Sequence, residues 1–101
     1  MDWVHNINIL NERRYEMKAL QNYVEKKNSW GKIFGQKPLS LSNAQDRQKI
    51  ADSIDAALSP ENLTCDGELP RAEVNRRYRE LTQAAKELKQ LDPSVKFYEF
   101  A

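Results

Sequence analysis

The sequence predicts an all-α protein, a small bundle of three main helices with an aromatic connector and an extended aromatic C-terminal tail. Three segments repeat apolar residues at the spacing of one helical face. Prolines, glycines and cap-forming polar residues separate these segments. Because the chain has 101 residues, 40% hydrophobic and 31% charged, we expect residues 1–101 to form a single helical domain.

The first helix is expected over residues 9–28, where apolar residues are separated by seven, three and four positions. Either Asn8 or Asn11 is suited to accept hydrogen bonds from the free amides of the first turn. The expected core face consists of Leu10, Met17, Leu20 and Val24, widened by Tyr15, Ala19 and Tyr23.

A connector is expected over residues 30–38, because two glycines and a proline interrupt helical regularity there. The connector carries Trp30, Ile33 and Phe34. Leaving all three side chains in water would expose an unusual apolar patch. We therefore expect them to fold back over the core.

The second helix is expected to begin at Ser42, which stands with Gln45 in the spacing of a capping box. Ser59-Pro60 is expected to end it. The predicted core face consists of Ala44, Ile50, Ala51, Ile54, Ala57 and Leu58, and the predicted outer face of Asp46, Asp52 and Asp55.

Ser59-Pro60 and Asp66-Gly67 predict a short turn of helix and then a loop. Pro70 suits the first position of the third helix, where a missing amide costs little. Asp92-Pro93 is expected to end this helix. Its predicted core face consists of Val74, Tyr78, Leu81, Ala85 and Leu88, with Ala84 and Leu91 along the edge.

Catalytic and metal-binding residue sets are lacking. The chain has one histidine, His5, and one cysteine, Cys65, whose neighbour Asp66 disfavours the thiolate that a nucleophile requires. These two residues do not complete a zinc site, and the segment around Asp66-Gly67-Glu68 lacks the alternating oxygen ligands of a calcium loop. No glycine loop of the phosphate-binding type is found. We expect no enzyme, no cofactor and no metal.

The net charge of +1 is unevenly distributed, with +3 over residues 1–38, −4 over 39–69 and +2 over 70–101. A dedicated nucleic-acid-binding protein typically has a larger excess of one sign. The sequence shows neither a membrane-spanning stretch nor the pattern of a signal peptide. We therefore expect a cytoplasmic protein with no membrane partner.

The connector region also offers a candidate nucleic-acid site, because lysines there alternate with aromatic residues on which bases stack. The competing interpretation has the aromatic residues covering the core while the lysines stay in water. The candidates are Lys26, Lys27, Trp30, Lys32, Phe34 and Lys37.

The third helix adds Arg71, Arg76 and Arg79 to that candidate site, and helical geometry predicts that Arg76, Arg79 and Lys86 point outward. The four-residue spacings from Glu73 to Arg77 and from Arg76 to Glu80 favour ion pairs within the helix instead. About eleven residues separate the second and third helices, which is too many for the short turn of a DNA-binding helix-turn-helix motif.

The C-terminal tail, residues 94–101, is too apolar for an ordinary frayed end and is expected to pack as an extended arm. Packing on its own core and docking on a partner are both open. Aromatic and arginine residues are typical anchors of protein interfaces. The protein-binding candidates are therefore Trp30, Phe34, Arg76, Arg79, Phe97, Tyr98 and Phe100, with Trp3 as a further aromatic residue.

Residues 63–74, Leu-Thr-Cys-Asp-Gly-Glu-Leu-Pro-Arg-Ala-Glu-Val, together with Arg77-Tyr78 and Leu88, are similar to short accessory proteins of large tailed bacteriophages. This resemblance covers about a third of the chain. It implies a protein that acts in the host bacterial cytoplasm by binding a host or phage protein. It assigns no catalytic residue.

Two functional expectations follow. The first is a non-enzymatic adaptor or inhibitor that docks on another protein or on a second copy of itself. The alternative is a nucleic-acid-binding accessory protein that uses the lysine and aromatic connector together with the basic face of the third helix.

Overall fold

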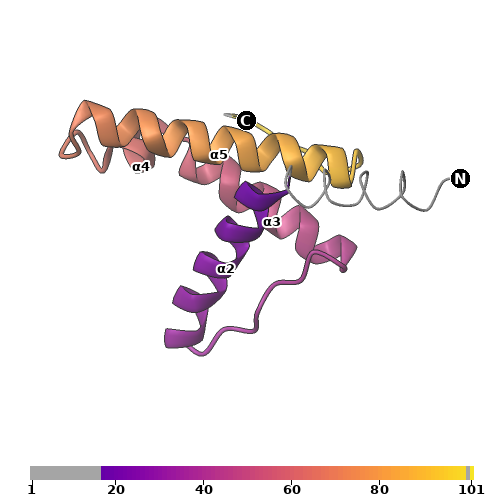
Figure 1. Cartoon of the computed structure of the whole chain (residues 1–101). Helices are drawn as coiled ribbons and strands as arrows, with labels where there is room; N and C mark the ends of the chain where they lie inside the picture. The colour runs from indigo at the N-terminus through magenta and orange to yellow at the C-terminus, as the bar shows by residue number, and fades with distance from the viewer. Residues whose placement is uncertain (1–16, 100) are drawn as a thin grey trace, which may run out of the picture.

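The computed structural model describes residues 17–99 and 101, and within them the chain forms four helices and no strand. These are α2 (Lys18–Ile33), α3 (Ala44–Ala57), α4 (Pro60–Thr64) and α5 (Arg71–Leu91) (Figure 1). The predicted all-α class is confirmed. Expectations that concern Asn8, Leu10, Asn11 and Tyr15 lie outside the described residues.

The long helix α5 organises the molecule. It packs on α2, α3 and α4, with α3 beneath it and α4 near its N-terminal end (Figure 1). Helix α2 meets α5 at its first turns and then runs steeply away from it, so its C-terminal end projects from the body. Helices α2 and α5 therefore diverge from their point of contact and leave an open angle between them.

The core lies between the first half of α2, the middle of α3 and the second half of α5. The predicted stripes on α2 and α3 supply most of it, and Tyr23 and Ala19 pack at its edge as expected. Burial of these side chains is the main force that holds the three helices together. The buried apolar residues are Leu20, Val24, Ile50, Ala51, Ile54, Leu58, Ala84, Ala85, Leu88 and Val95.

The predicted end of the first helix near Asn28 is wrong, because α2 continues through Trp30 and Gly31 to Ile33. A glycine inside a helix costs only about 1 kcal/mol relative to alanine. The true stop is Gly35, whose φ of 73° is easy for glycine. Its amide donates to the Lys32 carbonyl and the Gln36 amide to the Gly31 carbonyl, at 3.1 and 2.8 Å, as in a Schellman motif.

The expectation that Trp30, Ile33 and Phe34 fold back over the core is also wrong, because all three are exposed. Leu39 and Leu41 fill that role and pack against the core. The Asn28 side chain fixes the connector there: its Nδ2 donates to the Leu39 carbonyl at 3.0 Å, and its Oδ1 accepts from the Leu39 amide at 2.8 Å.

Helix α3 begins after Asn43, not at Ser42. The Asn43 side chain accepts hydrogen bonds from the amides of Gln45 and Asp46, whereas the Ser42 hydroxyl pairs with that of Ser40. Asparagine and serine cap helices almost equally well, so residue type alone does not favour Ser42 over Asn43.

Asp55 does not lie on the outer face of α3 as expected. Its side chain is buried and accepts hydrogen bonds from the amides of Glu99 and Ala101. The C-terminal tail passes over this part of α3 and satisfies the carboxylate with backbone groups. Such pairing is what allows a carboxylate to be buried.

The short helix and loop after α3 match the prediction, with Ser59 as the cap of α4. Pro70 is the N-terminal cap residue of α5 and not its first helical residue as expected, and α5 ends at Leu91 with Asp92 as its C-terminal cap residue, so the predicted stop at Asp92-Pro93 is confirmed. On α5, Tyr78 is exposed rather than part of the core face, and Leu91, expected along the edge of that face, is exposed as well. The buried charged side chain of this helix is Glu87, which lies opposite Tyr78 around the helix axis. The core face of α5 is therefore shorter than its apolar stripe.

The tail packs as the extended arm that the sequence predicts. Val95 is buried, and Phe97 packs against the core. Gln48 holds the arm on α3, because its side chain accepts from the Lys96 amide at 3.0 Å and donates to the Lys96 carbonyl at 2.9 Å. Phe100 lies outside the described residues.

Candidate functional site

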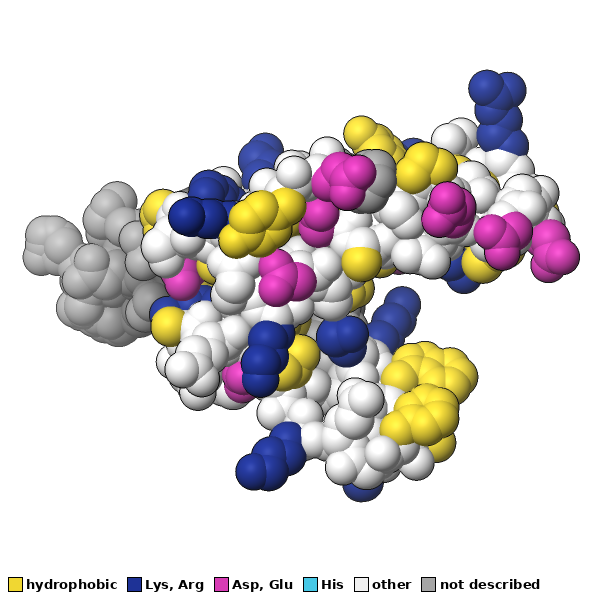
Figure 2. Space-filling view, turned by 180° about the vertical axis from the view of Figure 1, so that it is seen from behind, with side chains coloured by type: hydrophobic (Ala, Val, Ile, Leu, Met, Phe, Trp, Pro, Cys, Tyr) yellow, Lys and Arg dark blue, Asp and Glu magenta, His cyan; other side chains and the backbone are white. Residues whose placement is uncertain are grey.

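Three large apolar side chains stand together at the projecting end of α2. Trp30, Ile33 and Phe34 are 66%, 71% and 72% exposed. Their spacings of three and four residues place them on one side of the helix. Figure 2 shows hydrophobic side chains gathered at this end of the molecule. We call these three residues the α2 tip.

The backbone under the α2 tip is well defined by hydrogen bonds. Phe34 is the C-terminal cap residue of α2, and its amide donates to the Gly31 carbonyl at 3.0 Å. The Schellman motif at Gly35 turns the chain away directly after Phe34. The last carbonyl groups of α2 are therefore hydrogen-bonded, which we call a closed helix end. The three apolar side chains stand on this closed helix end and not on a loose connector.

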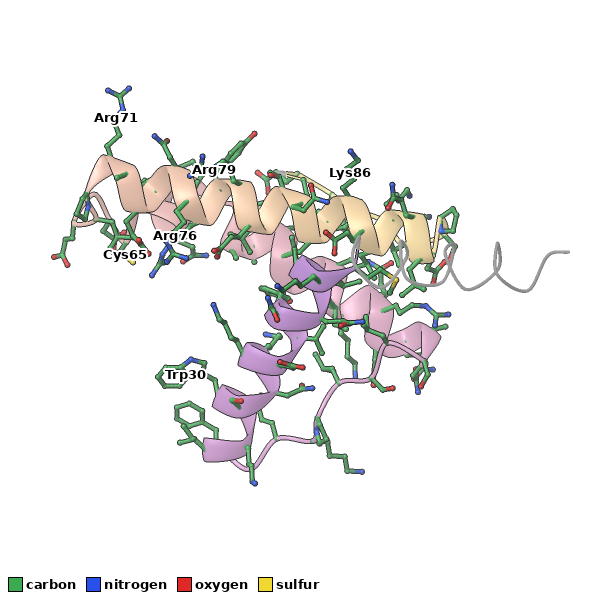
Figure 3. All side chains as sticks on the ribbon, viewed as in Figure 1. Trp30, Cys65, Arg71, Arg76, Arg79 and Lys86 are labelled. Atoms are coloured by element: carbon green, nitrogen blue, oxygen red, sulfur yellow. The ribbon has the colours of Figure 1, made fainter. Side chains whose placement is uncertain are left out.

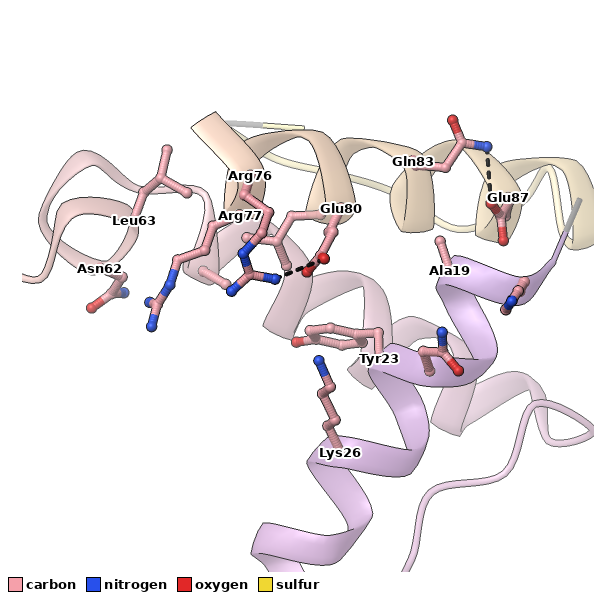
Figure 4. A pocket seen from close by; sticks show the side chains of 14 residues that line it. Ala19, Tyr23, Lys26, Asn62, Leu63, Arg76, Arg77, Glu80, Gln83 and Glu87 are labelled. Carbon is pink, nitrogen blue, oxygen red and sulfur yellow. Dashed lines mark hydrogen bonds and ion pairs between the residues drawn. The ribbon is translucent and has the colours of Figure 1, made fainter. Parts of the chain in front are cut away.

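A cleft of about 740 Å³ lies in the angle between α2 and α5, with α4 and the end of α3 at its base (Figure 4). This volume is within the range of ordinary small-molecule pockets. We call it the α2–α5 cleft. It is lined by Lys18, Ala19, Asn22, Tyr23, Lys26, Ala57, Asn62, Leu63, Arg76, Arg77, Glu80, Leu81, Gln83 and Glu87.

The α5 wall of the cleft carries a network of ion pairs. Arg76 pairs with Glu73 and, at 2.8 Å, with Glu80. Arg77 lies 3.6 Å from Glu73, and its Nη1 also donates to the Cys65 sulfur at 3.7 Å. The predicted ion pairs within this helix are confirmed.

These ion pairs perturb the titration of their members. The hydrogen bond from Arg76 is the largest cause that lowers the pKa of Glu73. The same hydrogen bond and the charge of Glu73 raise the pKa of the Arg76 guanidinium. Both groups are therefore held in their charged forms.

The α2 wall of the cleft carries Tyr23 and Lys26. The Tyr23 hydroxyl forms a hydrogen bond of 2.7 Å with the Ser53 hydroxyl of α3. Burial raises the pKa of Tyr23, although the bond to Ser53 acts in the opposite direction. Lys26 points into the cleft, toward the side where Arg76 and Arg77 reach in from α5 (Figure 4). The cleft thus combines an aromatic surface with several cations.

The predicted site residues divide between two sides of the molecule. Figure 3 shows Arg71, Arg79 and Lys86 on the side of α5 that faces away from α2. Arg76 is exposed as expected, but it lies on the α2 side of α5, where its side chain lines the cleft. The physical reason is that Arg76 shares its helix face with Glu80 and Glu87, which face α2.

The lysines of the predicted nucleic-acid site do not gather on one surface either. Helical spacing places Lys26 and Lys27 on the same face of α2 as Trp30, but Lys32 on the opposite face. Lys37 lies in the connector beyond the helix.

Tyr98 is 72% exposed on a separate surface, where it lines a shallow hollow with Asp52 and Glu99. Phe97 is partly covered by the core, and Trp3, His5 and Phe100 lie outside the described residues.

Among residues 17–99 and 101, no group of histidine, cysteine and acidic side chains is placed to hold a metal ion. No helix in this part of the chain is long and apolar enough to cross a membrane.

Sequence reasoning missed several cleft residues, among them Lys18, Tyr23, Leu63 and Arg77. A signal was present in α2. Tyr23, Lys26 and Trp30 follow at spacings of three and four residues, and this series is visible as one face only if the helix extends past Asn28. Treating Gly31 as a helix breaker removed that pattern.

We compared the chain with models of protein families, with curated proteins and with solved structures, and none of the three comparisons finds a match.

Proposed function

We propose that this chain is a non-enzymatic accessory protein that docks on another protein through the α2 tip. The observation that carries the proposal is the exposure of Trp30, Ile33 and Phe34 side by side on a closed helix end. In line with the resemblance of residues 63–74, we propose an accessory role of the phage type, performed in the host bacterial cytoplasm.

Contiguous exposed apolar side chains that are framed by polar residues are typical of interaction sites. Tryptophan is enriched among the residues that contribute most of the binding energy at such sites. Full burial of Ile33 or Phe34 stabilises a complex by about 1.5 to 3 kcal/mol each. Association itself costs several kcal/mol, so the tip serves as an anchor and needs additional contacts around it.

One observation favours the nucleic-acid alternative, because Lys26 and Lys27 flank Trp30 on one helix face. The other cations of that alternative do not join them. Arg71 and Arg79 lie on the far side of α5, and Arg76 is engaged by two carboxylates. A protein partner therefore fits the arrangement better.

The proposal is tested by affinity capture from bacterial lysate with three immobilised proteins: the wild type, the double variant Trp30→Ser/Phe34→Ser, and Tyr98→Ser as a control at an equally exposed aromatic residue. We expect specific proteins to be retained by the wild type and by Tyr98→Ser but not by the double variant. Identical retention by all three would refute docking through the tip.

The alternative is tested by fluorescence anisotropy of labelled single-stranded DNA and RNA at about 50 and about 200 mM salt. Binding that weakens steeply with salt and disappears in Lys26→Ala/Lys27→Ala would replace the protein-binding proposal by the nucleic-acid one. We expect no such binding.

A further inference from the structure

Cations outnumber carboxylates in the lining of the α2–α5 cleft. Glu80 accepts a hydrogen bond from Arg76 at 2.8 Å. Glu87 accepts from the Leu20 amide at 3.0 Å and from Gln83 at 2.8 Å. No described carboxylate pairs with Lys18 or Lys26. The acidic groups of the cleft are thus already engaged, whereas its lysines face the open space.

One face of α2 joins the cleft to the α2 tip without interruption. Ala19, Tyr23, Lys26, Trp30 and Phe34 follow at helical spacing along it. At a rise of 1.5 Å per residue this face is about 22 Å long, or about four helical turns. Ala19 and Tyr23 lie at the inner end in the cleft, and the tip lies at the outer end.

Resting on the proposed function, we propose that the α2–α5 cleft and the α2 tip together bind an acidic amphipathic helix of the partner protein. Its apolar face lies along Tyr23, Trp30 and Phe34. Its acidic side chains meet Lys18 and Lys26, which complement their charge.

The fold favours a helix as the occupant. An extended segment that adds to a sheet needs a free strand edge, and residues 17–99 and 101 contain no strand. An amphipathic helix presents apolar side chains every three or four residues, the same period that the face of α2 follows. A second copy of this chain is a poorer fit in the same place, because it would bring Lys26 and Lys27 against Arg76 and Arg77.

The test uses a displayed library of random sixteen-residue peptides, selected on the wild-type protein and counter-selected on Trp30→Ser/Phe34→Ser. We expect the enriched peptides to be acidic, with apolar residues at helical spacing. We further expect Lys26→Glu to weaken their binding about tenfold, and Lys49→Glu, a control at an exposed lysine of α3 outside the cleft, to leave it unchanged.

The outcomes separate this inference from the proposed function. Enriched peptides that need Trp30 and Phe34 but are basic, neutral or proline-rich, or that ignore Lys26→Glu, overturn the inference and leave docking through the tip intact. If no enriched peptide depends on Trp30 and Phe34, both proposals fail. Circular dichroism of each variant, compared with the wild type, confirms that lost binding is not lost folding.

Discussion

The backbone amide of Leu20 donates a hydrogen bond to Oε1 of Glu87, 3.0 Å away, across 67 positions of the chain. Leu20 lies in the first turn of α2, where amides lack partners within the helix and where Met17 supplies no side-chain cap. The Glu87 side chain is 2% exposed. One buried carboxylate of α5 therefore fixes the start of α2, and with it the direction in which α2 projects.

Replacing Glu87 by alanine is expected to lower the free energy of unfolding by about 1 to 3 kcal/mol, because the Leu20 amide and Gln83 lose their acceptor. Glu87→Gln keeps an acceptor oxygen and should cost less. Urea denaturation measures both. The exposed Glu80→Ala is the control, and an equal loss in Glu87→Ala and Glu80→Ala would contradict the capping role.

Removing the Asn28 side chain is expected to release the connector from α2. Asn28→Ala loses both hydrogen bonds to Leu39, each worth about 1 kcal/mol. We expect the free energy of unfolding to fall by about 1 to 2 kcal/mol and the Leu39 amide to exchange with solvent faster. Asn22→Ala, at an exposed position on the same helix, should change stability by less than about 0.5 kcal/mol.

The α2 tip should contribute little to folding. Trp30→Ser and Phe34→Ser are each expected to change the free energy of unfolding by less than about 0.5 kcal/mol, since both side chains are already in water. Leu88→Ala, in the core, should cost about 2 to 5 kcal/mol. Tip variants as costly as Leu88→Ala in urea denaturation would mean that the tip packs on the core in solution.

Asp92 is expected to make stability sensitive to acid. Hydrogen bonds from Ser94 and then from Arg47, at 2.7 Å, lower its pKa from the ordinary 3.8 to about 2. A lowered pKa means that the folded state binds the proton more weakly than the unfolded chain. The stabilisation is therefore complete above a pH of about 4 and is lost as the pH falls toward about 2.

The measurement is a series of urea midpoints across that interval, for the wild type and Asp92→Asn. We expect the variant to lose less stability than the wild type as the solution becomes acidic. Parallel curves would show that Asp92 is not the group responsible.

Periodicity and boundary signals predicted the parts of the fold that depend on local chemistry. The apolar stripe of α3, the Ser59 cap of α4 and the stop at Asp92 are all visible in the sequence. In each case a short run of neighbouring residues determines the outcome, so a single sequence is sufficient to identify it.

Features that depend on distant partners were not predictable in this way. Asp55 and Glu87 read as ordinary surface carboxylates until the tail and α2 bring backbone amides to them. Leu39 took the place expected for Trp30, because the hydrogen bonds from Asn28 decide which part of the connector turns inward. The cleft was missed for a related reason, since it exists only through the angle between α2 and α5.

Helix α2 is anchored in the core by its first half only, and its second half projects from the body. Its last buried residue is Val24, and Phe34 stands ten positions further on, about 15 Å along the axis. A rotation of about 10° at the fixed end displaces the far end of such a rod by about 3 Å while Leu20 and Val24 stay in place. Beyond Val24, the hydrogen bonds between the Asn28 side chain and Leu39 support the projecting half of the helix. A change that weakens these hydrogen bonds would therefore redirect the tip without disturbing the core.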